Sequence, residues 1–220
     1  MAEFSGTFAF PAAITQQMSH AGPGTEPSDA ELMRRVASGD REAFSTVYCR
    51  HHASIFRFAR LMTGSNAMAE DIVQEVFLAL MRQGSRYAPE RALLSTYLFG
   101  IARHQTRRRL ARERRFVGFG DEDCRSHEPV APGSVADEVI RECELQRLRR
   151  AIVALPSRYR EAVILCDLQN LAYAEAAATL GCAIGTIRSR LHRGRQLLAD
   201  KMQRHGSSLA ASASRMRCAV

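Results

Sequence analysis

The sequence predicts an all-α protein made of two small helical domains joined by a flexible linker, and three observations support this. Apolar residues recur every three or four positions through most of the chain, which is the helical period. Capping residues precede these segments and glycines follow them. An acidic stretch rich in Gly and Pro interrupts the periodicity. The predicted boundaries are a disordered tail at 1–27, domains at 28–115 and 135–205, a linker at 116–134, and a frayed tail at 206–220.

Four helices are predicted in the first domain. Ser28 followed three residues later by Glu31 forms a capping-box pattern at the start of the first helix. The other residues expected to begin or end helices here are Gly39, Asp40, Gly64, Asn66 and Gly84. The first predicted helix ends at Gly39 and the second near Gly64. The third runs from the Asn66 cap to about Gln83, and the fourth from about Leu93 to Arg115.

The third predicted helix has one apolar and one acidic face. Its inner stripe is Ile72, Val73, Val76, Phe77 and Leu80, and its outer face is Asp71, Gln74, Glu75, Leu78 and Arg82. On a basic chain, an acidic face with an exposed Leu favours a protein partner with a basic surface. An ordinary solvated helix face is the alternative on helix physics alone.

The fourth predicted helix combines arginines with aromatic residues. Residues 90–116 hold eight Arg and two Glu. Its inward residues are expected to be Leu94, Tyr97, Leu98, Ile101 and Ala102, and its outward or lateral residues Thr96, Phe99, Arg103, Thr106 and Arg107. Arginines interleaved with aromatics beside the Ser85–Arg91 loop suit unstacked bases and a single-stranded backbone.

The second domain is expected to end in two short helices around Gly181. Before them, helix is predicted from about Val135, and Pro156 is expected as the first residue of the next helix. The last helix carries an inner stripe of Ile184, Ile187, Leu191 and Leu198. Its opposite face carries Gly185, Ser189, His192, Arg193 and Gln196, flanked by Thr186 and Arg188. This pattern is typical of a helix-turn-helix whose second helix enters a DNA major groove. An amphipathic surface hairpin is the alternative.

Charge and composition narrow the function classes. The net charge of +8 and the pI near 9.7 favour a polyanionic partner. With no apolar run of about 18 residues and no signal-peptide pattern, a cytoplasmic location is expected. The six cysteines lack a CxxC pair and are expected to be reduced thiols.

Catalysis, cofactors and metals are not expected. The sequence has no Walker-type phosphate loop and no visible nucleophile constellation. Cys124 with His127 offers at most two metal ligands, and no second pair follows at zinc-site spacing. The His51–His52 pair and His104 are the other candidates for a metal or thiol sensor.

Three blocks of the chain resemble the extracytoplasmic-function (ECF) sigma factors of the sigma-70 superfamily. AEDIVQEVFLAL (69–80) resembles the helix that binds core RNA polymerase in that family. YLFGIARHQTRRRL (97–110) resembles the strand-opening and −10 segment, and residues 158–198 resemble the domain that reads the −35 element. Tyr97, His104, Ala176 and Gly194 depart from the residues usual in the family.

The resemblance implies a role for each block. Core polymerase would be bound by Asp71, Gln74, Glu75 and Leu78. The −10 element and strand opening would involve Tyr87, Arg91, Tyr97, Phe99, Arg103, His104, Arg107 and Arg108. The −35 duplex would be read by Thr186, Arg188, Ser189, His192 and Arg193.

The implied function is a non-enzymatic initiation factor that binds core RNA polymerase, recognises a two-part promoter and helps to melt it. The resemblance also implies an anti-sigma partner. The competing hypothesis is a dimeric operator-binding regulator that uses the same helix-turn-helix. That regulator would have no use for the acidic face at Asp71–Leu78 or for the segment of arginines and aromatics.

Overall fold

The computed structural model describes residues 27–116 and 136–217, and every regular element in these ranges is helical. The all-α prediction is therefore confirmed. The predicted N-terminal tail and linker lie, apart from their edge residues, outside the described residues, as does the Cys124–His127 pair.

The N-terminal domain contains four α-helices. They are α1 (Asp29–Ala37), α2 (Arg41–Thr63), α3 (Asn66–Gln83) and α4 (Leu94–Phe116), with a 3₁₀ turn at Gly84–Arg86. The Ser28 hydroxyl caps α1 by accepting a hydrogen bond from the Glu31 N–H at 3.2 Å. Asp40 caps α2, and Gly64 ends it with a left-handed φ of 76°. These ends agree with the sequence prediction.

The cap of α3 differs from the prediction by one residue. Ser65, not Asn66, has the extended backbone of an N-cap, and its hydroxyl accepts a hydrogen bond from the Met68 N–H at 3.3 Å. Asn66 is the first helical residue instead. Ser and Asn are comparable caps, so sequence preference alone could not choose between neighbours.

The C-terminal domain is formed by α5 (Ala136–Val153), α6 (Ser157–Val163), α7 (Tyr173–Leu180) and α8 (Ile184–Arg217). Pro156 is the N-cap of α6, one position before the predicted place. A π-helical turn, Ile164–Leu168, continues α6, and the Gln169 N–H closes it by bonding to the Ile164 carbonyl at 3.0 Å.

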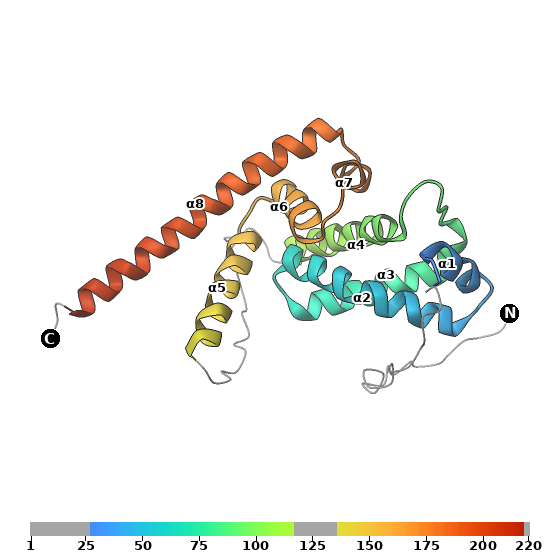
Figure 1. Cartoon of the computed structure of the whole chain (residues 1–220), viewed down its shortest axis with the longest axis horizontal. Helices are drawn as coiled ribbons and strands as arrows, with labels where there is room; N and C mark the ends of the chain where they lie inside the picture. Colours follow the sequence, from blue (N-terminus) through green and yellow to red (C-terminus); the bar gives the residue numbers. More distant parts are fainter. Residues whose placement is uncertain (1–26, 117–135, 218–220) are drawn as a thin grey trace.

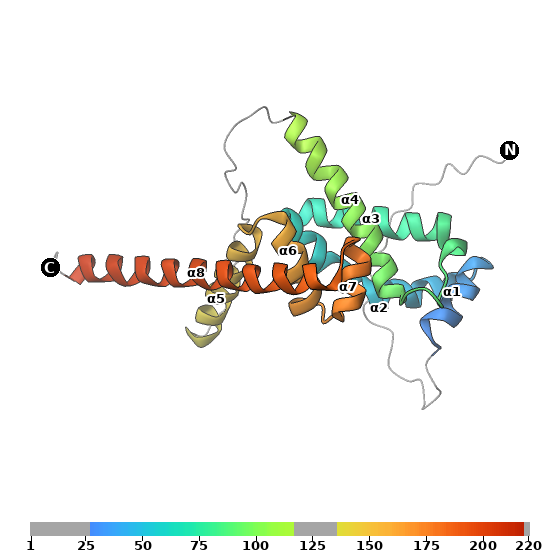
Figure 2. The same cartoon turned by 90° about the horizontal axis from the view of Figure 1, so that it is seen from above.

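The last helix is longer than predicted. The expected frayed tail from 206 is helical as far as Arg217, and α8 extends away from the rest of the molecule as one continuous helix (Figures 1 and 2). Gly206 costs a helix up to ~1 kcal/mol, but the residues that follow it are mostly Ala and Ser, without proline. One glycine in this sequence context therefore does not end α8.

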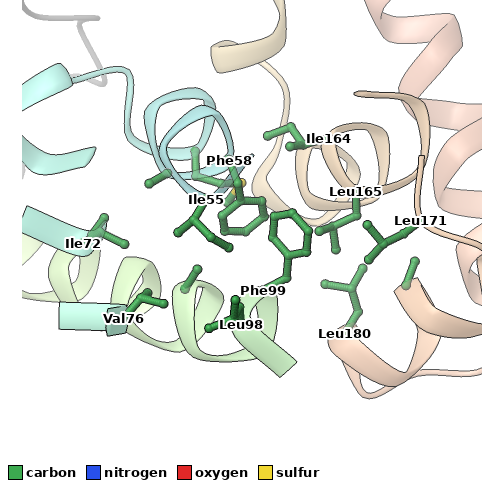
Figure 3. Close-up of a cluster of buried hydrophobic side chains, with 14 of the residues drawn as sticks. Ile55, Phe58, Ile72, Val76, Leu98, Phe99, Ile164, Leu165, Leu171 and Leu180 are labelled. Atoms are coloured by element: carbon green, nitrogen blue, oxygen red, sulfur yellow. The ribbon is translucent and has the colours of Figure 1, made fainter. Parts of the chain in front are cut away.

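The two domains pack against each other. Helix α7 lies on α4, and α5 and α6 lie on α2 (Figures 1 and 2). The buried apolar side chains of both domains form one continuous cluster. Figure 3 shows Phe99 of α4 between Phe58 of α2 and Leu165, Leu171 and Leu180 of the C-terminal domain. Burying one such aromatic side chain contributes about 1.5–3 kcal/mol.

Candidate functional site

The turn between α7 and α8 has the geometry of a helix-turn-helix. Gly181 adopts a left-handed φ of 62°, and the Cys182 N–H bonds back to the Ala177 carbonyl at 3.1 Å. At the start of α7, the Glu175 carboxylate accepts a hydrogen bond from the Ala172 N–H at 2.8 Å. Ala176 is buried, and α7 packs on both α8 and α4.

The polar face predicted for α8 is exposed. Arg188, Ser189, His192 and Arg193 all face solvent, and Thr186 is half-buried. On the inner side Ile187 and Leu191 are buried as predicted, whereas Ile184 is exposed because it is the first residue of the helix. The exposed set offers guanidinium, hydroxyl and imidazole groups along one side, the donors and acceptors that base edges and phosphates require.

Gln196, which the sequence placed on this polar face but not among the −35 residues, links two of these side chains. Its side-chain amide donates to His192 Nε2 at 3.0 Å, and its carbonyl accepts from the Arg193 guanidinium at 3.2 Å. Gln196 lies one turn after His192, so the i, i+4 spacing could have indicated it.

A second pair holds α8 to the π-helical turn. The Arg195 guanidinium donates to both carboxylate oxygens of Asp167, at 2.6 and 3.0 Å. The hydrogen bonds and the charge of Asp167 raise the pKa of Arg195. The Arg195 guanidinium therefore holds α8 to the π-helical turn through Asp167.

The acidic face of α3 is also exposed, with one internal contact. Gln74, Glu75 and Leu78 face solvent, whereas the Asp71 carboxylate accepts a hydrogen bond from the Arg109 guanidinium of α4 at 2.6 Å. Met81, which the sequence reading left out, is 61% exposed and extends the apolar part of this face beyond Leu78. Its spacing of three from Leu78 was the available signal.

The predicted −10 residues fall into two groups. Arg91, His104, Arg107 and Arg108 are exposed, and the Tyr87 and Tyr97 rings lie together with centroids 5.5 Å apart. Burial raises the pKa of the Tyr87 hydroxyl above its usual value. These side chains form a basic and aromatic surface around the start and outer side of α4.

Phe99 and Arg103 form the second group and do not face solvent. Phe99 is 2% exposed, and Arg103 Nε donates to Glu161 of α6 at 3.1 Å. Thr96 and Thr106, also expected to face outward or sideways, are buried. The outward or lateral orientation predicted for these α4 residues is therefore wrong. Phe99 packs against Phe58 of α2 and lies beside Leu165 of the C-terminal domain, and Arg103 pairs with Glu161.

The described parts of the chain contain no group of three or more His, Cys, Asp or Glu side chains placed to hold a metal ion. No helix among the described residues is long and apolar enough to cross a membrane. The site is thus three surfaces: the outer faces of α8 and α3, and the surface around α4.

Two family models match the chain where these surfaces lie. Sigma-70 region 2 matches residues 47–116, and sigma-70 region 4 matches residues 145–198. The first covers α3 and α4, and the second covers the helix-turn-helix.

The chain is similar to named relatives over most of its length. It is 35% identical to the ECF RNA polymerase sigma factor SigE of Mycolicibacterium smegmatis, over 86% of this chain and 74% of that protein. It is 30% identical to the ECF RNA polymerase sigma-E factor of Escherichia coli, over 80% of this chain and 95% of that protein. Among solved structures, the sigma factor RpoE of Bartonella quintana, in complex with the anti-sigma factor NepR, superimposes on this chain with a TM-score of 0.59. The two sequences are 27% identical, and the match covers 73% of this chain and 96% of RpoE. Both the matched regions and these identities show that the chain belongs to the ECF RNA polymerase sigma factors.

Proposed function

We propose that the three surfaces divide the work of this sigma factor: α3 binds core RNA polymerase, the surface around α4 handles the −10 strand, and α8 reads the −35 duplex. The observation that carries the proposal is the polar face of α8. Although the two domains pack together, they leave Arg188, Ser189, His192 and Arg193 exposed on one side of a helix-turn-helix. The chain carries out no chemistry of its own and acts with the polymerase in the cytoplasm.

For the −35 element, guanidinium groups supply the phosphate affinity and the remaining side chains supply base readout. Each good base contact is worth about 1–3 kcal/mol of discrimination. Gln196 positions His192 and Arg193 before DNA arrives, which lowers the conformational entropy lost on binding.

For the polymerase, Glu75 and Leu78 form the centre of the α3 face. Leu78 is 44% exposed and Met81 is next to it, so an apolar patch is bordered by carboxylates. Such a patch suits a partner surface that is apolar at its centre and basic at its edge. Asp71 takes part while it also holds α4 through Arg109.

For the −10 strand, Tyr87 and Tyr97 provide ring faces for unstacked bases, and Arg91, Arg107 and Arg108 neutralise the backbone. An anti-sigma factor is a further proposed partner, since the Bartonella relative was solved in complex with one. Co-purification with candidate anti-sigma proteins tests this part.

The division of work is tested by variants on separate surfaces. Glu75→Arg should abolish retention of the chain on immobilised core polymerase, while Glu42→Arg, a charge reversal of an exposed carboxylate on α2, should leave retention unchanged. Arg193→Ala should weaken binding of the holoenzyme to −35 duplex at least tenfold, with Arg34→Ala of α1 as the matched control. Unchanged retention of Glu75→Arg, or equal DNA affinity of the two Arg variants, would contradict the assignment.

A further inference from the structure

The rotation of α8 about its own axis decides where its polar side chains point. Side-chain atoms lie about 5–6 Å from a helix axis, so a rotation of about 20° moves them by roughly 2 Å. The donor–acceptor distances of good hydrogen bonds vary by only about 0.5 Å. Whatever fixes this rotation therefore decides which base edges the proposed −35 residues can reach.

Apolar packing fixes where α8 crosses α6 but defines its rotation less closely. The crossing lies at Gly194, where an added Cβ would be 2.8 Å from Val163 Cγ2. Ile187 and Leu191, on the same side of α8, are buried. The hydrophobic contribution of these contacts is non-directional, so it selects the buried side of the helix without specifying a precise angle.

A bidentate ion pair next to this crossing supplies the direction. Arg195 follows Gly194, and its Nη2 and Nε atoms donate to the two carboxylate oxygens of Asp167 at 2.6 and 3.0 Å. Two parallel hydrogen bonds fix the plane of the guanidinium as well as its distance. Asp167 raises the pKa of Arg195, and Tyr173 at the start of α7 raises it further. The guanidinium of α8 is thus held by the π-helical turn and lies beside the start of α7.

The π-helical turn sets the direction from which Asp167 approaches. The Gln169 N–H bonds to the Ile164 carbonyl five residues back, whereas the partner in an α-helix is four residues back. This wider turn changes the angle at which its residues project from the end of α6. Asp167 belongs to the turn and pairs with α8 from there. Single π-turns within α-helices occur frequently at functional sites.

The pair lies at the edge of the proposed −35 face. Arg188, His192 and Arg195 are spaced four and three residues apart, so they share one side of α8. The side chains of Arg195 and Asp167 are 56% and 26% exposed. An ion pair this exposed contributes little to stability. Its effect on the orientation of α8 is therefore its larger consequence.

We infer that Asp167 and Arg195 are positioning residues for −35 recognition: their ion pair sets the rotation of α8 so that its polar side chains meet the base edges together. The inference rests on the proposed −35 role of α8. Neither residue itself needs to contact DNA. Loss of the pair should reduce discrimination between DNA sequences more than it reduces affinity for DNA in general.

Two variants break the pair in different ways. Asp167→Asn removes the negative charge and turns an amide N–H toward the guanidinium. Arg195→Lys keeps the positive charge but loses the planar fork that makes two parallel hydrogen bonds. The matched control is Glu142→Gln, which breaks the ion pair of Glu142 with Arg149 on α5, at 3.0 Å and with side chains 43% and 37% exposed.

The first measurement is the ratio of two affinities of the holoenzyme, made from core polymerase and the full-length chain. One fluorescent duplex carries the −35 element of a start site mapped by in vitro transcription, and the other carries the same base pairs in scrambled order. Asp167→Asn and Arg195→Lys should each lower the ratio about tenfold, the equivalent of one good base contact. Glu142→Gln should keep the parent's ratio. An unfolded fraction lowers both affinities equally, so it leaves the ratio unchanged.

The second measurement is a scan of single base-pair substitutions through the −35 duplex. In the parent, each contacted position should show its own loss of affinity. A changed rotation affects every recognition side chain, so Asp167→Asn should shrink these losses at all contacted positions. A direct base contact by Arg195 would instead change the loss at one position.

Three results would overturn the inference. They are a parental ratio in Asp167→Asn or in Arg195→Lys, an equal change of affinity for both duplexes in Asp167→Asn, and an effect confined to one base pair. The second of these would mean that Asp167 only withholds Arg195 from phosphates. A parent holoenzyme that did not distinguish the two duplexes would instead contradict the proposed −35 role of α8, so the two failures are distinguishable.

Discussion

Gly194 lies where α8 crosses α6, and replacing it with Ala should destabilise the fold even though Ala favours helices. A Cβ at this position would be 2.8 Å from Val163 Cγ2 and 3.5 Å from both the Cβ and the carbonyl oxygen of Tyr159. Optimal carbon–carbon separations are about 3.5–4.0 Å. Val163 is buried and β-branched, so its side chain has little freedom to move aside.

Two opposing free-energy terms set the size of the effect. Gly→Ala inside a helix gains about 0.5–1 kcal/mol of stability. Overpacking a close contact costs about 1–3 kcal/mol. The net expectation for Gly194→Ala is a loss of about 1 kcal/mol in the free energy of unfolding. Gly100→Ala in α4, where no atom lies within 4 Å of the added Cβ, should instead gain about 0.5–1 kcal/mol.

Urea unfolding followed by far-UV circular dichroism measures these changes, because the chain is helical and has no Trp. The Val163→Ala background removes the clashing methyl group, so there Gly194→Ala should become neutral or stabilising. The two sites are then coupled by about 1 kcal/mol or more in a double-mutant cycle. If Gly194→Ala stabilised the parent chain as much as Gly100→Ala does, the close-packing explanation would be refuted.

Three further predictions concern single positions. Gly181→Ala should lower the free energy of unfolding by about 1–2 kcal/mol, measured by urea denaturation, because the left-handed backbone disfavours a Cβ although the space is empty. Burial raises the pKa of Cys166 to about 11, so at pH 8 iodoacetamide should modify Cys49 and Cys143, seen by mass spectrometry of peptides, and leave Cys166 unmodified. Hydrogen bonds from the Ala43 N–H and from Arg35 lower the pKa of Asp40 below its usual 3.8. The stabilising contribution of the Asp40 carboxylate is complete above its pKa in the unfolded chain and is lost as the pH falls through its pKa in the folded chain. Asp40→Asn should therefore flatten the fall in the free energy of unfolding below about pH 4. An unchanged dependence of the free energy of unfolding on pH would show that Asp40 contributes nothing.

Helix ends were the part of the fold that local sequence determined best. Ser28, Asp40, Gly64 and Gly181 each act on their own backbone through a hydroxyl, a carboxylate or freedom at positive φ. Such effects need no distant partner, so the residue type is sufficient to predict them. The errors at Ser65 and Pro156 are shifts of one position between adjacent acceptable caps.

The site was predicted less completely because its environment is tertiary. The helical wheel placed Phe99 and Arg103 off the inner face of α4, although Phe99 packs against Phe58 of α2. It could not show that Glu161 and Leu165, some sixty residues away in the chain, lie against these two side chains. Likewise, Gly194 resembles an unfavourable choice until the neighbouring side chain of Val163 is known.

The central claim is that this chain, with separate surfaces for polymerase and promoter, confers specific initiation on RNA polymerase. Its most direct test is in vitro transcription of genomic fragments by core enzyme with the purified chain, with transcript 5′ ends mapped. Discrete start sites should depend on the chain and should disappear with Glu75→Arg or Arg193→Ala, but persist with Glu42→Arg. Start sites that persisted with both Glu75→Arg and Arg193→Ala, or that appeared equally without the chain, would contradict it.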